Sequence, residues 1–113
     1  MNSLKADASF SQDLSLAALS FSTSYGRKFK LEGIYIHTTV PITETITITL
    51  DSGKGATYDT VERVKSLSGE SNFVWVPEGQ KNYQADDVIK IQCTQANGVG
   101  IIYGVVKASE VLL

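Results

Sequence analysis

Hydrophobic and polar residues alternate with a period of two along much of the chain. The clearest run is Ile42–Leu50. In this run Ile46, Ile48 and Leu50 point to one side, and the threonines between them point to the other. Such alternation of β-branched residues is typical of a strand with one buried face, and it would crowd every turn of a helix. The run therefore predicts a surface strand of a sheet.

The same pattern predicts further strands on both sides of this run. In chain order they are expected over Leu14–Ser24, Phe29–Thr38, Thr57–Leu67, Phe73–Val76, Val88–Thr94 and Gly100–Lys107. Residues typical of turns lie between them. Pro41 is expected to break the chain before the Ile42–Leu50 run, and Asn97-Gly98 predicts a hairpin that pairs the last two strands. Because Val61 and Val64 fall on opposite sides of a strict alternation, a bulge is expected near Arg63.

About seven short strands separated by turns predict an all-β fold, a single antiparallel sandwich. We place this domain at residues 14–108. Residues 1–13 are small and polar without a sustained period, which indicates a short N-terminal arm, flexible or docked. Residues 109–113 form a short C-terminal tail that ends in three apolar side chains. Deletion of residues 1–13 is accordingly expected to leave the fold intact.

Composition narrows the class of protein. The 113 residues include 10 basic and 12 acidic side chains, a net charge of −2, so no basic field favours nucleic-acid binding. With 42% hydrophobic residues the chain is expected to be globular. Its apolar runs are too short to predict a membrane span, and its first ten residues lack the apolar core of a secretory signal.

Candidate catalytic and metal-binding groups are few. One cysteine, Cys93, excludes an internal disulfide, and one histidine, His37, excludes a two-histidine metal site. The two could be drawn as a nucleophile and its base. However, Cys93 alternates with Ile89 and Ile91, as a small buried hydrophobe does. We expect no catalytic residue, no bound metal and no cofactor, and therefore no enzyme.

Glycine and aspartate clusters invite two further interpretations. Gly53-x-Gly55 and Gly98-x-Gly100 do not match a phosphate-binding loop, since neither opens a predicted helix. The aspartates could ligate calcium but lack EF-hand spacing, and turn or strand-end positions explain them better. They are Asp51, Asp59, Asp86 and Asp87.

Aromatic and basic residues leave two alternatives open. Trp75 and five tyrosines could form a sugar-stacking surface, but Trp75 lies in a compact apolar run typical of a core, and the tyrosines are dispersed along the sequence. The basic cluster Arg27-Lys28-x-Lys30 is either a solvated strand edge or a contact with an acidic protein surface.

Three stretches resemble a family of small virion proteins from tailed bacteriophages, over about two-thirds of the chain. They are the block Leu31–Val61 with its D-S-x-x-G-x-x-Y-D turn, the run FVWVPEG at Phe73–Gly79, and the block Tyr83–Lys107. The resemblance implies a small β-sandwich or jelly-roll-like domain with a structural role. It implies most directly a decoration or cement protein of the capsid.

From this resemblance we expect a non-enzymatic protein, made in the host cytoplasm, that binds the major capsid protein on the exterior of the particle. It would bind across adjacent shell subunits, as a homo-oligomer such as a trimer. Alternatives are a head–tail junction or tail component, and a carbohydrate- or host-surface-binding module, which would need exposed aromatics. The candidate intersubunit contacts are Leu4, Phe10, Arg27, Lys28, Lys30, Leu112 and Leu113.

Overall fold

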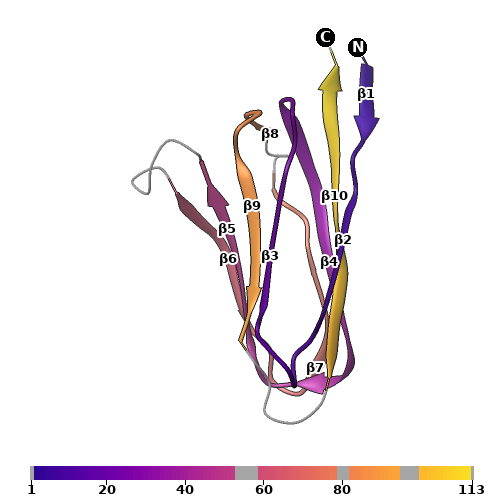
Figure 1. The fold of residues 1–113 in the computed structure, drawn as a ribbon, viewed down its shortest axis with the longest axis vertical. Coiled ribbons are helices and arrows are strands. Elements are labelled where there is room, and N and C mark those ends of the chain that lie inside the picture. The colour runs from indigo at the N-terminus through magenta and orange to yellow at the C-terminus, as the bar shows by residue number, and fades with distance from the viewer. Residues whose placement is uncertain (1, 53–58, 79–81, 95–99, 113) are drawn as a thin grey trace.

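The computed structural model describes residues 2–52, 59–78, 82–94 and 100–112. These residues form two antiparallel sheets that pack face to face, as Figure 1 shows, and none of them lies in a helix. The all-β sandwich predicted from the alternating pattern is confirmed. The first and last strands leave the sandwich side by side at one end.

The first sheet is four strands wide, although six strands contribute to it. These are β1 (Asn2–Lys5), β2 (Ala8–Asp13), β4 (Phe29–Ile42), β7 (Glu70–Trp75), β8 (Asn82–Tyr83) and β10 (Ile101–Leu112). β10 and β4 pair with each other at its centre. β1 and β2 follow one another along the outer side of β10, and β7 and β8 both pair with the outer side of β4.

The second sheet contains four strands in the order β3–β9–β5–β6. Their bounds are β3 (Leu19–Ser24), β5 (Thr45–Asp51), β6 (Thr60–Ser66) and β9 (Val88–Cys93). β5 and β6 form a hairpin within this sheet, and the connections β1–β2 and β7–β8 stay within the first sheet. At every other connection the chain passes from one sheet to the other. The orders β2–β10–β4–β7 and β3–β9–β5–β6 are those of a jelly roll, in which two Greek keys interlock.

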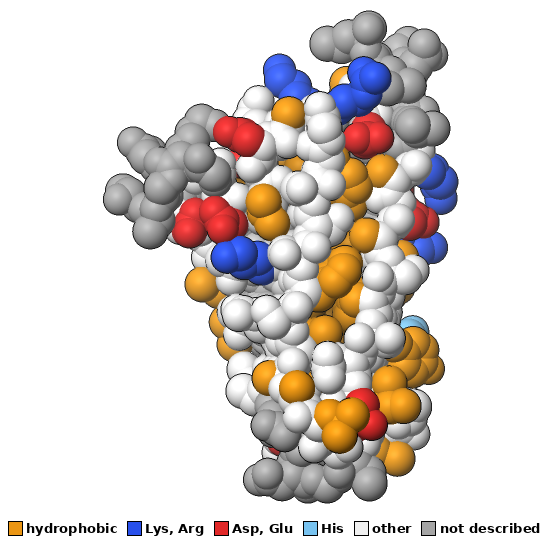
Figure 2. Space-filling view, viewed as in Figure 1, with side chains coloured by type: hydrophobic (Ala, Val, Ile, Leu, Met, Phe, Trp, Pro, Cys, Tyr) orange, Lys and Arg blue, Asp and Glu red, His pale blue; other side chains and the backbone are white. Residues whose placement is uncertain are grey.

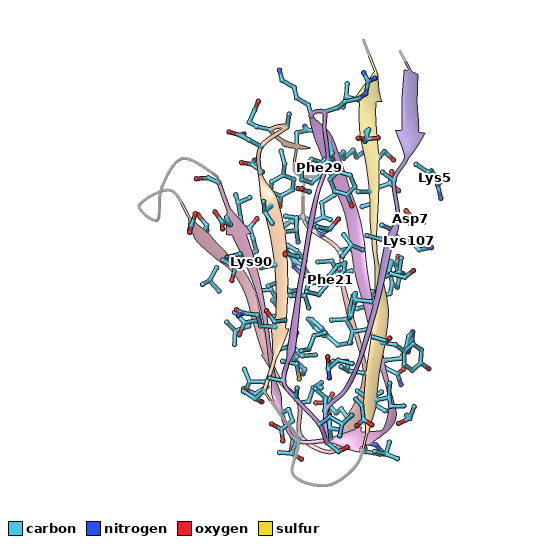
Figure 3. All side chains as sticks on the ribbon, in the orientation of Figure 1. Lys5, Asp7, Phe21, Phe29, Lys90 and Lys107 are labelled. Atoms are coloured by element: carbon cyan, nitrogen blue, oxygen red, sulfur yellow. The ribbon has the colours of Figure 1, made fainter. Side chains whose placement is uncertain are left out.

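The core lies between the sheets and is filled by the inward-facing members of each alternation. Phe21 and Phe29 point into this space, whereas Lys90 and Lys107 point outward (Figure 3). Trp75 is half-buried and packs against the core, as its apolar run predicts. The largest fully buried side chains are Leu14, Phe29, Leu31, Ile34, Ile36, Ile46, Ile48, Ile89, Ile91, Ile102 and Val106.

The segment expected to be an arm is instead the edge of the first sheet. β2 pairs with the first half of β10, and Phe10 is only 8% exposed, with its ring 5.0 Å from that of Phe21. Ser9 and Ser11 face outward on either side of Phe10. One apolar side chain between serines is too short an alternation to reveal a strand in the sequence. At the other terminus, the predicted tail continues β10 up to Leu112.

Two predicted boundaries are wrong. β4 continues through Pro41 to Ile42, because pairing with β10 ends at Thr38 and pairing with β7 resumes only at Ile42, so the missing N–H of Pro41 interrupts no ladder. The hairpin predicted at Asn97-Gly98 does not pair its flanking strands, since β9 and β10 lie in different sheets. These two residues themselves lie outside the described residues.

The bulge predicted near Arg63 is confirmed. Ile48 pairs with Arg63 and Thr49 pairs with Val61, so Glu62 is the extra residue of β6. The bulge reverses the alternation, and both Val61 and Val64 are exposed. A bulge on an edge strand also discourages the pairing of that edge with other chains.

Candidate functional site

Two aromatic residues and a histidine gather on the outer side of the first sheet. Their inward-facing neighbours belong to the core, so the alternation itself turns these rings outward. The register places Tyr103 opposite His37 and Val105 opposite Tyr35. We call the group of Tyr35, His37, Tyr103, Val105 and Lys107 the aromatic face. Hydrophobic atoms are visible beside the only histidine at the lower right of Figure 2.

Apolar side chains around the aromatic face are exposed as well. Tyr103 exposes 44% of its surface, and Ile101 on the same strand exposes 43%. Val74, which pairs with Tyr35, and the nearby Val76 are also exposed. No described segment covers them. Apolar residues gathered on one face, as opposed to scattered singly, are typical of a binding surface.

The position of the Tyr35 ring depends on Gly33. A Cβ atom at Gly33 would lie 3.0 Å from Cε1 of Tyr35, so the ring lies over the glycine. The Nζ atom of Lys107 lies 5.2 Å from the centre of the same ring. This is a cation–π contact, and it keeps the ammonium group at the outer surface of the sheet.

The ring of His37 is oriented by a neighbour on β7. Its Nδ1 atom donates to Oδ1 of Asn72 at 2.5 Å, because an amide oxygen can only accept. The neutral ring then presents Nε2 as an acceptor. The ring also lies 5.7 Å from that of Tyr103 at an interplanar angle of 33°. Ser11, Tyr103, His37 and Asn72 thus form one row across four strands.

Most of the predicted contact residues meet at the end of the sandwich where the two termini lie. Arg27 and Lys28 are exposed in the turn before β4, and Lys30 follows in β4. The amide of Val111 donates to the carbonyl of Lys28 at 2.8 Å, and β1 pairs with the last residues of β10. We call β1, residues 109–112 and the turn at residues 25–28 the terminal end. Figure 2 shows Lys and Arg side chains there.

The remaining candidates have three different outcomes. Phe10 belongs to the core and is not at the surface, because β2 is part of the sheet. Leu4 and Leu112 lie in the paired strands of the terminal end. Leu113 lies outside the described residues.

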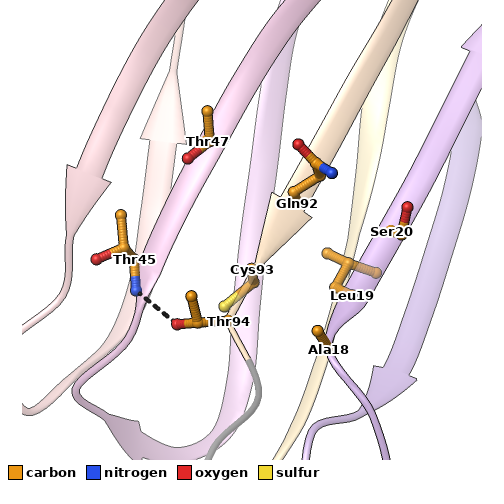
Figure 4. Close-up of a pocket in the computed structure, with 8 residues that line it drawn as sticks. All are labelled: Ala18, Leu19, Ser20, Thr45, Thr47, Gln92, Cys93 and Thr94. Carbon is orange, nitrogen blue, oxygen red and sulfur yellow. Dashed lines mark hydrogen bonds between the residues drawn. The ribbon is translucent and has the colours of Figure 1, made fainter.

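A shallow depression of about 350 Å³ lies on the outer side of the second sheet (Figure 4). Its lining residues are Ala18, Leu19, Ser20, Thr45, Thr47, Gln92, Cys93 and Thr94. Oγ1 of Thr94 accepts from the amide of Thr45 at 3.2 Å and donates to Glu44 at 2.5 Å. Burial raises the pKa of the Cys93 thiol to about 11, so the thiol stays protonated at neutral pH and is a poor nucleophile.

Cys93 and His37 are not brought together. Cys93 faces the core from β9 in the second sheet, and His37 lies on the outer side of the first. Aspartates considered as calcium ligands have other partners. Asp59 accepts from the amide of Ser52 at 3.0 Å, Asp87 accepts from that of Gln84 at 2.8 Å, and Asp51 pairs with Nζ of Lys90 at 3.0 Å. Across the described ranges, no three His, Cys, Asp or Glu side chains lie close enough to hold a metal ion.

No protein-family model matches this chain, and comparison with curated proteins finds no match either. Among the described residues, no helix is long and apolar enough to cross a membrane.

The aromatic face is a candidate surface that the sequence did not predict, because its tyrosines are dispersed along the chain. The sequence does contain a signal, because Tyr35 and His37 alternate with Ile34 and Ile36 and must point away from the core. The missing information is the pairing of β10 with β4, which joins Tyr103 to this group across a long separation in sequence.

Proposed function

We propose that this chain is a non-enzymatic structural protein of a phage particle, a decoration protein that binds across adjacent subunits of the capsid shell through its terminal end. The observation that carries this proposal is the meeting of both termini and the basic turn in one place. The resemblance of three sequence blocks to small phage virion proteins supports the same class. The jelly roll is common among viral capsid proteins, although a fold alone does not define a function.

The terminal end offers two kinds of contact. Lys5, Arg27 and Lys28 are exposed cations, which suit an acidic shell surface. β1 pairs with β10 on one side, and no other described strand lies on its second side, so its backbone can accept a further strand. A rigid sandwich fixed at one end by such contacts would hold two neighbouring shell subunits together.

Many weak contacts suffice for this role. A shell presents its subunits in a repeated array, so an oligomer of this chain, such as a trimer, would engage several sites at once. Linked binding events raise the overall affinity without any new contact. The alternative within the structural class is a component of the head–tail junction or tail, which would be present in far fewer copies.

The first test is the copy number in purified particles, measured by quantitative mass spectrometry against the major shell protein. Copies comparable to the shell subunit are expected. A copy number as small as that of a single ring would favour a role at the head–tail junction or in the tail over decoration. Absence of the chain from particles would refute the proposal.

The second test locates the contact. The variant Arg27→Ala/Lys28→Ala should lower the amount of chain that rebinds to stripped particles at least fivefold. The matched control is Arg63→Ala/Lys65→Ala, which removes the same two charges from the edge strand β6. The control should rebind as the wild type does. Equal rebinding of both variants would exclude the basic turn as the contact.

A further inference from the structure

The aromatic face combines apolar rings with hydrogen-bonding groups in a way that suits one class of ligand. A sugar ring has apolar C–H faces and hydroxyls around its rim. Tyrosine and histidine likewise combine a flat ring with polar atoms at the edge. Tyr103 is the most open of the rings, at 44% exposure, and it lies beside His37.

Hydrogen-bonding groups lie on both sides of Tyr103 along the same row. Ser11 pairs with Tyr103 on β2 and is exposed. On the other side, Asn72 fixes the His37 ring so that its neutral form presents an acceptor at Nε2. A purely apolar protein contact would not require this arrangement, whereas the hydroxyls of a stacked sugar would use it.

The only charged member of the aromatic face is a cation. Within the described residues Lys107 forms no ion pair, and its ammonium group lies over the Tyr35 ring. Lys107 follows Tyr103 by four residues on β10, a separation of about 13 Å along a strand. The residues that the register places between them, Val105, Tyr35 and Ser9, are uncharged. The carboxylate of Asp7 lies close to Lys107 at the sheet edge (Figure 3), but the stretch between Tyr103 and Lys107 carries no negative charge and offers an anion only the lysine.

We propose that the aromatic face binds an oligosaccharide that carries carboxylate groups, such as a chain of uronic acids. One sugar ring stacks on Tyr103, its hydroxyls bond to the His37–Asn72 pair, and a carboxylate of a neighbouring sugar pairs with Lys107. This site lies on a different part of the molecule from the terminal end, so a chain attached to a shell could still present it.

The test is a titration of the ¹⁵N-labelled full chain with tetragalacturonate, followed by NMR, with galactotetraose as the neutral probe. Tetragalacturonate should shift amide signals of β4 and β10 and bind at least threefold more tightly than galactotetraose. Tyr103→Ala should weaken binding about tenfold. Lys107→Gln should weaken it three- to fivefold and remove its dependence on salt, because the lost contact is an exposed ion pair.

Two matched controls separate the proposed contacts from general surface effects. Val61→Ala removes an exposed apolar side chain from the opposite sheet, and Lys90→Gln removes a lysine from that same sheet. Both should bind tetragalacturonate as the wild type does. Unshifted spectra, equal binding of the neutral probe, or an equal loss in Val61→Ala and Tyr103→Ala would overturn the proposal.

The outcome is independent of the shell contact. Tyr103→Ala should still attach to particles as the wild type does, and Arg27→Ala/Lys28→Ala should still bind tetragalacturonate. Failure of either proposal can therefore be told from failure of the other.

Discussion

The hydroxyl of Tyr83 donates a hydrogen bond to Oε1 of Glu62 at 2.8 Å, and this bond joins the two sheets. Tyr83 belongs to β8 of the first sheet, and Glu62 is the bulged residue of β6 in the second. The Tyr83 ring is buried and stacks on Phe29, with ring centres 5.1 Å apart. Burial and the Glu62 carboxylate raise the pKa of Tyr83 well above its usual value.

Removal of this hydroxyl should weaken the contact between the sheets. Tyr83→Phe keeps the stacked ring but removes the hydrogen bond from the hydroxyl to the Glu62 carboxylate, so the free energy of unfolding should fall by about 1–2 kcal/mol. Tyr35→Phe removes the same hydroxyl from a tyrosine on the outer side of the first sheet. It should change the free energy of unfolding by less than about 0.5 kcal/mol. Urea unfolding of the two variants measures both values. An equal change in both would show that the bond to Glu62 contributes nothing.

Gly104 occupies a place on β10 where no side chain fits. A Cβ atom there would lie 2.2 Å from the carbonyl oxygen of Tyr35 and 2.8 Å from Cζ of Phe10. Because the nearest atom is backbone, Gly104→Ala should cost about 2–3 kcal/mol or prevent folding. Gly26→Ala is the control, since nothing lies within 4 Å of its Cβ position. Thermal unfolding measures the midpoint temperature of each variant. Similar midpoints for Gly104→Ala and Gly26→Ala would contradict the close approach of Gly104 to the Tyr35 carbonyl.

Truncation from the N-terminus should leave the protein folded when it removes β1 and should prevent folding when it also removes β2. Deletion of residues 1–7 removes β1, and the sandwich should still unfold cooperatively. Deletion of residues 1–13 also removes Phe10 from the core, a loss that alone is worth about 3–5 kcal/mol, and it uncovers the first half of β10. That variant should be unfolded by circular dichroism. A folded variant lacking residues 1–13 would restore the interpretation of this segment as an arm.

Alkaline pH should destabilise the protein in a defined window. Burial raises the pKa of Cys93 from 9.0 to about 11. Below pH 9 the thiol holds its proton in both the folded and the unfolded chain. Between pH 9 and 11 the unfolded chain releases the proton first, so the free energy of unfolding should fall as the pH rises.

Cys93→Ala provides the comparison for this window. Between pH 9 and 10 the free energy of unfolding of Cys93→Ala should fall less steeply with pH than that of the wild type. This range lies below that in which the raised pKa values of Tyr25 and Tyr83 make the free energy of unfolding depend on pH as well. The native thiol should also react slowly with a disulfide reagent at pH 8 and rapidly in denaturant. Fast reaction of the native protein would contradict the burial of Cys93.

The alternation of side chains predicts most strands but not their partners. β-branched residues at every second place predict β5, with Ile46 and Ile48, and β9, with Ile89 and Ile91. The pairing of β10 with β2 and β4 depends on contacts between segments far apart in the chain, which no local pattern contains. The hairpin predicted from Asn97-Gly98 is wrong for this reason, since a good turn sequence does not require its flanking strands to pair.

The candidate surfaces were predictable to different degrees. Arg27 and Lys28 stand out in the sequence as a basic cluster, and the structure adds only their position beside the termini. Tyr35 and Tyr103 are separated by many residues and become neighbours only through the central ladder of the first sheet. A surface formed by strands far apart in the sequence therefore cannot be predicted until the topology of the sheet is known.

The central position of β10 has a consequence for how the protein must be made. This strand is synthesised after all the other described strands, yet it separates β2 from β4 in the finished sheet. Until it emerges, neither of those earlier strands has its main hydrogen-bonding partner, and the strand edges that β10 later covers stay unpaired. Completion of the first sheet must therefore wait until β10 has emerged, and it requires pairings between distant parts of the chain, which are slow to form. A truncated product that lacks β10 would expose those unpaired strands and aggregate.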